Sequence, residues 1–462
     1  MINPASGAGR SKPLTLAAMS LGFGVVQLDV TVVNTALNSI GTSLGGGVSE
    51  LQWVVSIHTI AFADLILTAG ALGDRSGAKK IFMSGFAVFT AASLACPLAP
   101  TAAILIAARA VQGLGAAILV PNSLAHLNHA YPKPTERGRA VGWWLAGASV
   151  ALTAGPPVGG ALMALVGWRS IFLVNLPIGL AGLWLTWRYV TDTPLASREL
   201  DLVGQAAAIA SLGTLAAALI EGGRRGWSDP WVIAAFGAAV ILTVLFVVRE
   251  RCAERPMLPP SLFRNPVFAR TTLIGLVVNI PFYGLIFVFS LYFQKINGLS
   301  ALATGLAFVP MMAAVLPANL LAPRLAERFG GPATVAAGAV LSATACLALL
   351  GIEPSTSHWA LCVPLIGMGC GIALSVPPLT SALLGSVEKS RSGVAAGVLN
   401  SARQTGSVLG VALFGSLIGQ TNDFISGMRT AFVISALLLV FAASTTSIGR
   451  RDSAEVTHEN AE

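Results

Sequence analysis

The chain has 462 residues, of which 55% are hydrophobic and only 10% are charged, and its mean hydropathy is +0.76. A soluble globular protein carries about 25% charged residues, so this composition excludes a soluble protein of this length. The net charge of +8 does not indicate nucleic-acid binding, because the basic residues stand in short segments between apolar runs. The five cysteines are scattered without the spacing of metal ligands. We therefore expect no metal, no cofactor and no nucleic-acid partner.

Apolar segments of about 20 residues, the length that spans a bilayer, follow one another along the chain. We predict fourteen of them as membrane-spanning helices. The first six lie near 14–38, 51–72, 81–99, 102–125, 140–166 and 170–188. The next two lie near 202–220 and 231–248, and the last six near 268–293, 303–323, 332–351, 358–380, 393–419 and 430–448.

Two short strings recur at nearly the same distance. Residues 72–77 match 325–330, and residues 138–142 match 393–397, with offsets of 253 and 255. Parallel repeats of six spans build one major transporter fold. We therefore predict an all-α membrane protein with two six-helix bundles and two inserted helices. The predicted parts are an N-terminal tail 1–13, a bundle 14–190, a linker with the inserted helices 191–266, a second bundle 267–448 and a C-terminal tail 449–462.

The distribution of Lys and Arg predicts the orientation. If the N-terminus is cytoplasmic, 21 of these residues fall on the inward side, 5 fall outside and 2 lie within spans, which accounts for all 28. Both termini are then cytoplasmic in a multi-pass protein of the cell inner (plasma) membrane. The alternative is a twelve-span chain with 202–248 lying at the membrane interface, which would leave Ser228 in the cytoplasm.

Residues 70–80 (GALGDRSGAKK) form a tight predicted turn between the second and third spans. Its glycines allow close backbone approach, and Asp74 can accept hydrogen bonds from a helix N-terminus. We predict that this turn is a cytoplasmic gating loop with Glu136 as a partner for its cations and a second copy near Glu327; the alternative is a topology signal only. The predicted gating residues are Gly70, Asp74, Arg75, Gly77, Lys79, Lys80, Glu136, Glu327 and Arg328.

Two charges lie deep in predicted spans. Arg109 lies inside the fourth span, where an arginine costs a few kcal/mol unless it faces a cavity and has a partner. Asp29 lies inside the first span, where its depth makes proton exchange feasible. The alternatives are an arginine that only pins helices together and a neutral, hydrogen-bonded structural acid.

The second span carries His58 and Asp64, which are about 240° apart around a helix at 3.6 residues per turn and so cannot share a face. His58 can titrate during transport or be structural. Asp64 is a further proton-coupling candidate and can attract a cationic substrate. The residues that we assign to a substrate cavity are Asn34, His58, Gln112, Asn122, Asn279, Asn400 and Arg403.

Residues 155–160 (GPPVGG) lie in the fifth span. Proline removes a helix hydrogen bond, and glycines let a neighbouring helix pack almost backbone to backbone. Gly155, Pro156, Gly159 and Gly160 therefore form a kinked, tightly packed element that can act as a gate or seal.

These strings together resemble the major facilitator superfamily, specifically its fourteen-span drug:proton antiporter branch. The carrying segments are the 70–80 loop, 109–117 (RAVQGLGAA), 155–160 and 28–37 (LDVTVVNTAL), with further matches at 168–179, 221–227 and 400–406. The resemblance covers nearly the whole chain except its tails. Ala78 departs from a usual basic residue, Asn38 from a usual proline and Ala151 from a frequent glycine. The resemblance implies a role in proton coupling for Arg109 and an antiporter motif at 155–160.

The predicted function is proton-coupled export of lipophilic small molecules such as drugs, dyes or antibiotics, by alternating access. Asp29 would bind the proton, and Arg109 would tune it. The partners are the cargo, protons and membrane lipids, and we expect a monomer and no enzymatic activity or catalytic residue. The alternatives are an importer of a small metabolite in the same fold and a non-transporting membrane sensor.

Overall fold

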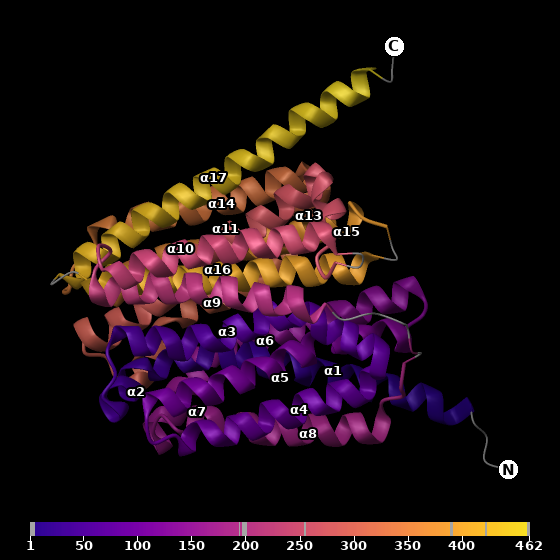
Figure 1. Ribbon diagram of the computed structural model, residues 1–462, viewed down its shortest axis with the longest axis horizontal. Coiled ribbons are helices and arrows are strands. Elements are labelled where there is room, and N and C mark those ends of the chain that lie inside the picture. The colour runs from indigo at the N-terminus through magenta and orange to yellow at the C-terminus, as the bar shows by residue number, and fades with distance from the viewer. Residues whose placement is uncertain are drawn as a thin grey trace. The chain divides into compact units, whose positions relative to one another are not determined.

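A computed structural model describes residues 5–193, 195, 201–253, 256–388, 391–420 and 423–459, and in these residues the regular elements are all helices (Figure 1). The predicted all-α class is confirmed. The ends of both predicted tails and part of the predicted linker lie outside the described residues. The same holds for Arg198, Arg255 and Lys389, three of the cations used to predict the orientation.

The chain divides into two compact units. The first takes in the chain up to Ala210 and the short segment Ser300–Gly305. Within it, α1 packs on α6 and α8, and α5 packs on α3 and α4. Its helices are α1 (Ala5–Val32), η1 (Val33–Ala36), α2 (Leu37–Leu44), α3 (Val48–Ser76), α4 (Ala78–Ala95), η2 (Cys96–Leu98), α5 (Ala102–Ala130), α6 (Pro134–Val166), α7 (Ser170–Leu173), α8 (Asn175–Tyr189) and the first part of α9 (Leu202–Arg225).

The second unit takes in Ser211–Leu299 and the chain from Leu306 onward. Within it, α11 packs on α16, and α15 packs on α13 and α14. Its helices are the rest of α9, α10 (Pro230–Cys252), η3 (Pro260–Arg264), α11 (Pro266–Leu291), η4 (Tyr292–Ile296), the end of α12 (Ala301–Ala307), α13 (Val309–Phe329), α14 (Gly331–Ala348), η5 (Leu349–Gly351), α15 (His358–Gly385), α16 (Ser392–Gln420) and α17 (Phe424–Glu459). The division falls inside α9, and the domain boundaries proposed from the sequence stay a prediction.

Thirteen helices of the described chain are long and apolar enough to cross a membrane. The fourteenth predicted span, 393–419, forms α16, which has 29 residues and so is about 44 Å long. It falls outside the thirteen because Asn400, Arg403 and Gln404 lower its apolar character. The inserted helix α10 presents Val240, Ile241, Val244, Leu245 and Val248 on its surface, as a helix that faces lipid does. The protein is a multi-pass membrane protein.

Several predicted spans are interrupted, and two of the interruptions have a clear local cause. The first span changes from α-helix to a 3₁₀ turn at Val33–Ala36, where Asn34 Nδ2 donates to the Val30 carbonyl at 3.0 Å and Thr35 Oγ1 to the Val32 carbonyl at 2.8 Å. Such side-chain bonds to the backbone compete with regular helix geometry. The predicted span 303–323 is two helices, α12 and α13, because Pro310 at the start of α13 cannot continue the hydrogen-bond ladder.

Candidate functional site

A close approach of α3 and α5 positions the buried arginine. A Cβ atom on Gly113 would overlap the carbonyl oxygen of His58, so only glycine lets these two helices meet backbone to backbone here. This contact brings Arg109, one turn before Gly113, against α3, where its Nε donates to the Val54 carbonyl at 3.2 Å. Residues 109–113 thus supply both the buried guanidinium of Arg109 and, at Gly113, the helix contact that positions it.

Arg109 is 1% exposed, and Asp29 of α1 is completely buried. The Nη1 atom of Arg109 donates to Asp29 Oδ2 in a short ion pair. The same nitrogen lies 2.6 Å from Gln112 Oε1, and the guanidinium lies 5.8 Å from the ring centre of Phe172. The two charges that the sequence singled out are therefore partners.

The second carboxylate oxygen of Asp29 is held by two amides. Gln112 Nε2 donates to Oδ1 at 2.8 Å and Asn175 Nδ2 at 2.9 Å. Gln112 also donates to Ser93 Oγ at 2.8 Å. The carboxylate thus accepts hydrogen bonds from α5 and α8, and a hydroxyl from α4 supports the amides.

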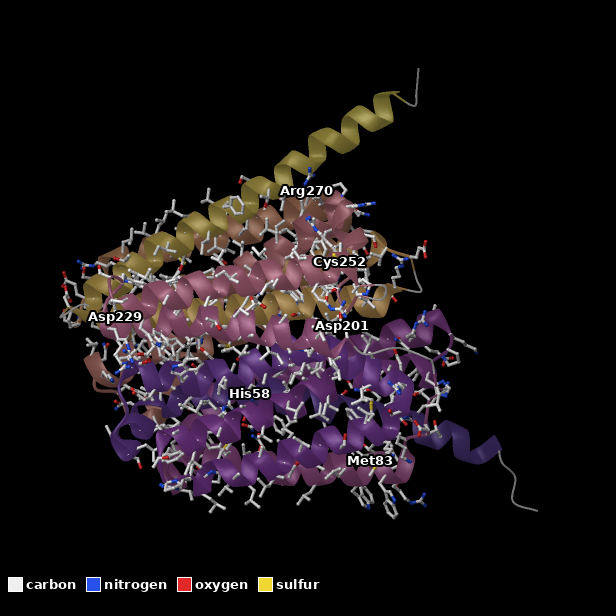
Figure 2. The ribbon with its side chains drawn as sticks, viewed as in Figure 1. His58, Met83, Asp201, Asp229, Cys252 and Arg270 are labelled. Carbon is white, nitrogen blue, oxygen red and sulfur yellow. The ribbon has the colours of Figure 1, made fainter. Side chains whose placement is uncertain are left out.

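His58 of α3 completes the cluster. Its Nε2 atom lies 3.9 Å from Asp29 Oδ2, beyond hydrogen-bonding distance, and the side chain is 1% exposed. Figure 2 shows His58 well inside the first unit, midway along its helices. We call Asp29, His58, Arg109, Gln112 and Asn175 the Asp29 cluster.

The Asp29 cluster contains one permanent cation and one carboxylate, so the two compensate each other. Removing one partner from a buried ion pair leaves an uncompensated charge, which costs several kcal/mol. A proton that neutralises Asp29 would have the same effect on Arg109. The carboxylate is fully buried and accepts hydrogen bonds from Arg109, Gln112 and Asn175. A change in the charge of Asp29 would therefore change the stability of this cluster.

The other predicted residues lie elsewhere. Asp64 is 8% exposed and has one carboxylate oxygen without a hydrogen bond, and its backbone carbonyl accepts from Gln205 of α9 at 3.0 Å. Asn122 donates to the carbonyls of Ala69 and Ile118 and lies against Gly73. His58 and Asp64 thus point to different neighbours.

Three residues assigned to the cavity belong to the second unit. Asn279 of α11 donates to the Gly275 carbonyl at 2.7 Å, and Asn400 of α16 donates to the Ala396 carbonyl at 3.1 Å. Arg403 is half-buried on α16. Asn34 of the first unit bonds to its own helix at Val30.

The glycines of 155–160 hold α6 against α1. A Cβ atom on Gly155 would overlap Thr31 Oγ1, and one on Gly159 would lie 2.5 Å from Thr35 Oγ1. Thr31 Oγ1 donates to the Leu152 carbonyl at 3.1 Å, which links the helices directly. The contact begins two residues beyond Asp29, so this motif supports the helix that carries the carboxylate. Gly160 meets the backbone of Ala301, and Pro156 that of Gly305, both within the first unit.

We expect Gly155→Ala to destabilise the protein by about 1–3 kcal/mol, because the added methyl group forces α6 away from α1. The matched control is Gly142→Ala on the same helix, where a Cβ atom has open space. That control should be neutral or stabilising, because alanine favours helix by about 1 kcal/mol over glycine. Thermal unfolding of the purified variants measures the difference. Equal unfolding temperatures for the two variants would contradict the close contact.

The loop 70–80 forms a tight connection from α3 to α4. Gly77 has φ of +93°, a conformation that favours glycine, and Gly330 repeats it with φ of +90° after α13. Asp192 and Thr193, which follow α8, accept hydrogen bonds from the first amides of α4, those of Lys79 at 3.2 Å and Ala78 at 3.3 Å. Arg75 lies in the last turn of α3, and Glu327 and Arg328 lie in that of α13.

The predicted pairing of Glu136 with the cations of this loop is wrong for this structure. Glu136 instead pairs with Lys12 at 3.0 Å and with Lys133 at 3.6 Å. Lys79 donates its Nζ to the Trp187 carbonyl at 3.1 Å. The reason is tertiary: α1 passes the start of α6 at Lys12, so this lysine reaches Glu136.

Sequence reasoning missed Asn175, Ser93 and Asp192. Asn175 lies within the 168–179 string, where its amide was one polar group in an otherwise apolar span. Ser93 is small and fully buried, and nothing in its neighbours marks it. Asp192 follows the sixth span, and only the folded chain shows that it meets the start of α4.

The fold and site can now be compared with known proteins. The family model described as Major Facilitator Superfamily matches residues 19–411. The methylenomycin A resistance protein of Streptomyces coelicolor is 37% identical over 94% of this chain and 91% of its own length. The multidrug resistance protein Stp of Mycobacterium tuberculosis is 36% identical over 88% and 76%, and the tetracenomycin C resistance and export protein of Streptomyces glaucescens is 30% identical over 90% and 77%.

A solved structure shows the same fold. The crystal structure of a bacterial homologue of the human lysosomal transporter Spinster matches with a TM-score of 0.67 at 17% identity, over 96% of this chain and 97% of that one. The family match covers most of the chain and agrees with the resemblance found in its motifs. The chain therefore belongs to the Major Facilitator Superfamily.

Proposed function

We propose that this transporter exports lipophilic small molecules in exchange for protons, and that Asp29 is the proton-binding group. The observation that carries the proposal is the fully buried Asp29–Arg109 ion pair. Ionisable groups inside membrane spans are costly and mark ion and substrate pathways. The curated relatives named for resistance and export support drugs or antibiotics as the cargo.

The coupling follows from the charge balance of the Asp29 cluster. While Asp29 is charged, its ion pair with Arg109 keeps the helices of the Asp29 cluster together, which we call the closed form. When a proton binds Asp29, Arg109 loses its counter-charge and the cluster opens. If the protein cannot hold proton and cargo together, cargo that binds the open form expels the proton from Asp29, and the protein exchanges one for the other by alternating access. The 70–80 loop would then close the cytoplasmic side, with Gly155–Gly160 as the seal on α1.

Transport by everted membrane vesicles tests the direction. The cargo is first identified in a susceptibility screen, as a toxic compound that a pump-deleted host survives only with this protein. When respiration acidifies the lumen of everted vesicles, we expect that compound to accumulate inside them, and collapse of the pH gradient to release it. An importer would instead accumulate the compound in right-side-out vesicles. A sensor would accumulate it in neither type of vesicle.

The orientation of the inserted helices is part of this proposal. Asp229, next to Ser228, and Cys252 lie at opposite ends of α10, whose 23 residues span about 34 Å (Figure 2). We expect a Ser228→Cys variant to react with a membrane-impermeant maleimide on intact cells. Cys252 is exposed and serves as the internal control, reacting only after permeabilisation. Protection of residue 228 in intact cells would favour the twelve-span topology.

A further inference from the structure

A second arginine lies within a membrane helix and has no counter-charge. Arg403 stands 11 residues beyond Ser392, where α16 begins, and is therefore about 17 Å along the helix. In the described part of the chain it forms no ion pair, and its ionisable neighbour is Tyr283 on α11, whose phenol carries no charge at neutral pH. An unpaired arginine at this depth is costly, so it needs an explanation.

The acidic residues of the second unit do not supply a partner. Between residues 256 and 420 the sequence has three, Glu327, Glu353 and Glu388, and all stand at helix ends or in loops. On the inserted helices, Glu221 binds Arg224 and Arg225, and Glu250 accepts from the Leu258 amide. The membrane interior of this unit thus has a positive charge without a negative one.

The internal repeat shows how this differs from the first unit. The offsets of 253 and 255 place Asp29 opposite residues 282–284, at the centre of which is Tyr283. In the first unit the carboxylate of Asp29 neutralises Arg109. The same offsets place Arg403 opposite residues 148–150, which carry no charge, so Arg403 has no counterpart in the first unit, and its ionisable neighbour is the phenol of Tyr283. The guanidinium of Arg403 thus has no carboxylate partner among the described residues.

The surroundings of Arg403 are polar but uncharged. Its side chain runs past Gly275, whose added Cβ would lie 3.5 Å from Arg403 Cγ. Asn279 lies one turn further along α11, and Gln404 has a buried amide oxygen without a partner. A guanidinium presents a planar fork of donors that matches a carboxylate in a bidentate pair.

We propose that Arg403 binds a carboxylate group of the cargo, so that the transported compounds are lipophilic organic anions. The cargo would supply the counter-charge that the second unit lacks. This inference rests on the proposed export function, because it assumes that a cargo enters the second unit's polar region. It assigns Arg403 a role in recognition that is separate from proton binding at Asp29.

Equilibrium binding to the purified protein, by scintillation proximity, tests the charge preference. The probes are radiolabelled 1-naphthoate and, as competitors of the same shape, 1-naphthamide and 1-naphthylmethylammonium. We expect naphthoate to bind about tenfold or more tightly than either competitor, as a charge-assisted hydrogen bond predicts. No binding of naphthoate by the wild type, or equal binding of the three compounds, would overturn the proposal.

Four variants test whether Arg403 causes the preference for naphthoate. Arg403→Gln should weaken naphthoate binding about tenfold and leave naphthamide unchanged, while Arg403→Lys should keep a partial preference. Tyr283→Asp keeps the guanidinium but supplies an internal carboxylate, so it should lose the preference as Arg403→Gln does. Lys295→Gln, in η4 beyond the end of α11, is the control and should bind as the wild type does. A Tyr283→Asp variant with undiminished preference for naphthoate would contradict the assignment.

The binding assay needs no proton gradient, which separates this inference from the proposed function. Gradient-independent transport together with a preserved naphthoate preference would overturn proton coupling alone. Gradient-driven export without any charge preference would overturn the role of Arg403 alone.

Discussion

Asp29→Asn is expected to abolish accumulation of the cargo in energised everted vesicles, reducing it to the level of vesicles without the protein. The amide keeps the shape of the side chain and can still contact Arg109, Gln112 and Asn175, but it cannot bind and release a proton. Exchange of labelled for unlabelled cargo, which requires no proton, should persist in the same variant. Loss of driven transport with retained exchange is the signature of a coupling group.

The matched control is Asp229→Asn. Asp229 caps α10 by accepting from the Trp231 amide at 2.8 Å, and asparagine caps helices equally well. Driven accumulation should therefore be unchanged. Gradient-dependent accumulation by the Asp29→Asn variant at the wild-type level would remove Asp29 from the coupling role.

Arg109→Met is expected to cause the largest loss of stability, about 3–5 kcal/mol, because it leaves the Asp29 carboxylate buried without a counter-charge. The double variant Arg109→Met/Asp29→Asn removes both charges and should recover much of that loss. Residues in direct contact couple in this way, so the two substitutions should not be additive. Thermal unfolding of the purified proteins measures the effect.

Arg169→Met is the control for the Arg109→Met variant. Arg169 donates to the Pro97 carbonyl at 2.9 Å and stacks on Trp168, and it has no carboxylate partner in the described residues. Its loss should cost far less than that of Arg109. Equal unfolding temperatures for Arg109→Met and the double variant would contradict this expectation, because removal of the second charge would then recover no stability.

The apolar segments predicted the helices well because a bilayer imposes a length and a composition on every span. Departures occur where single residues act locally, as at Asn34 and Thr35, whose side chains bond back to the first helix, and at Pro310, which divides the predicted tenth span. In α16, Asn400 and Arg403 are residues that we assigned to the substrate cavity. The same side chains, together with Gln404, lower the mean hydropathy by which a membrane span is recognised.

The charged members of the site could be predicted, and their neutral partners could not. Asp29 and Arg109 stand out because a charge within an apolar run is rare. Asn175 and Ser93 do not stand out, because single amides and hydroxyls are common in membrane helices and the sequence gives no register between α4, α5 and α8. Glu136 was assigned a wrong partner for the same reason, since its pairing depends on where the start of α1 lies.

The central claim is that Asp29 gives up a proton when cargo binds. It is tested most directly by adding the identified cargo to the purified protein in weakly buffered detergent solution, at a pH acid enough for Asp29 to carry a proton, and measuring the pH. The wild type is expected to release protons in proportion to the cargo bound, and the Asp29→Asn variant to release none while still binding cargo. The absence of proton release from the wild type, or equal release from the variant, would contradict the account.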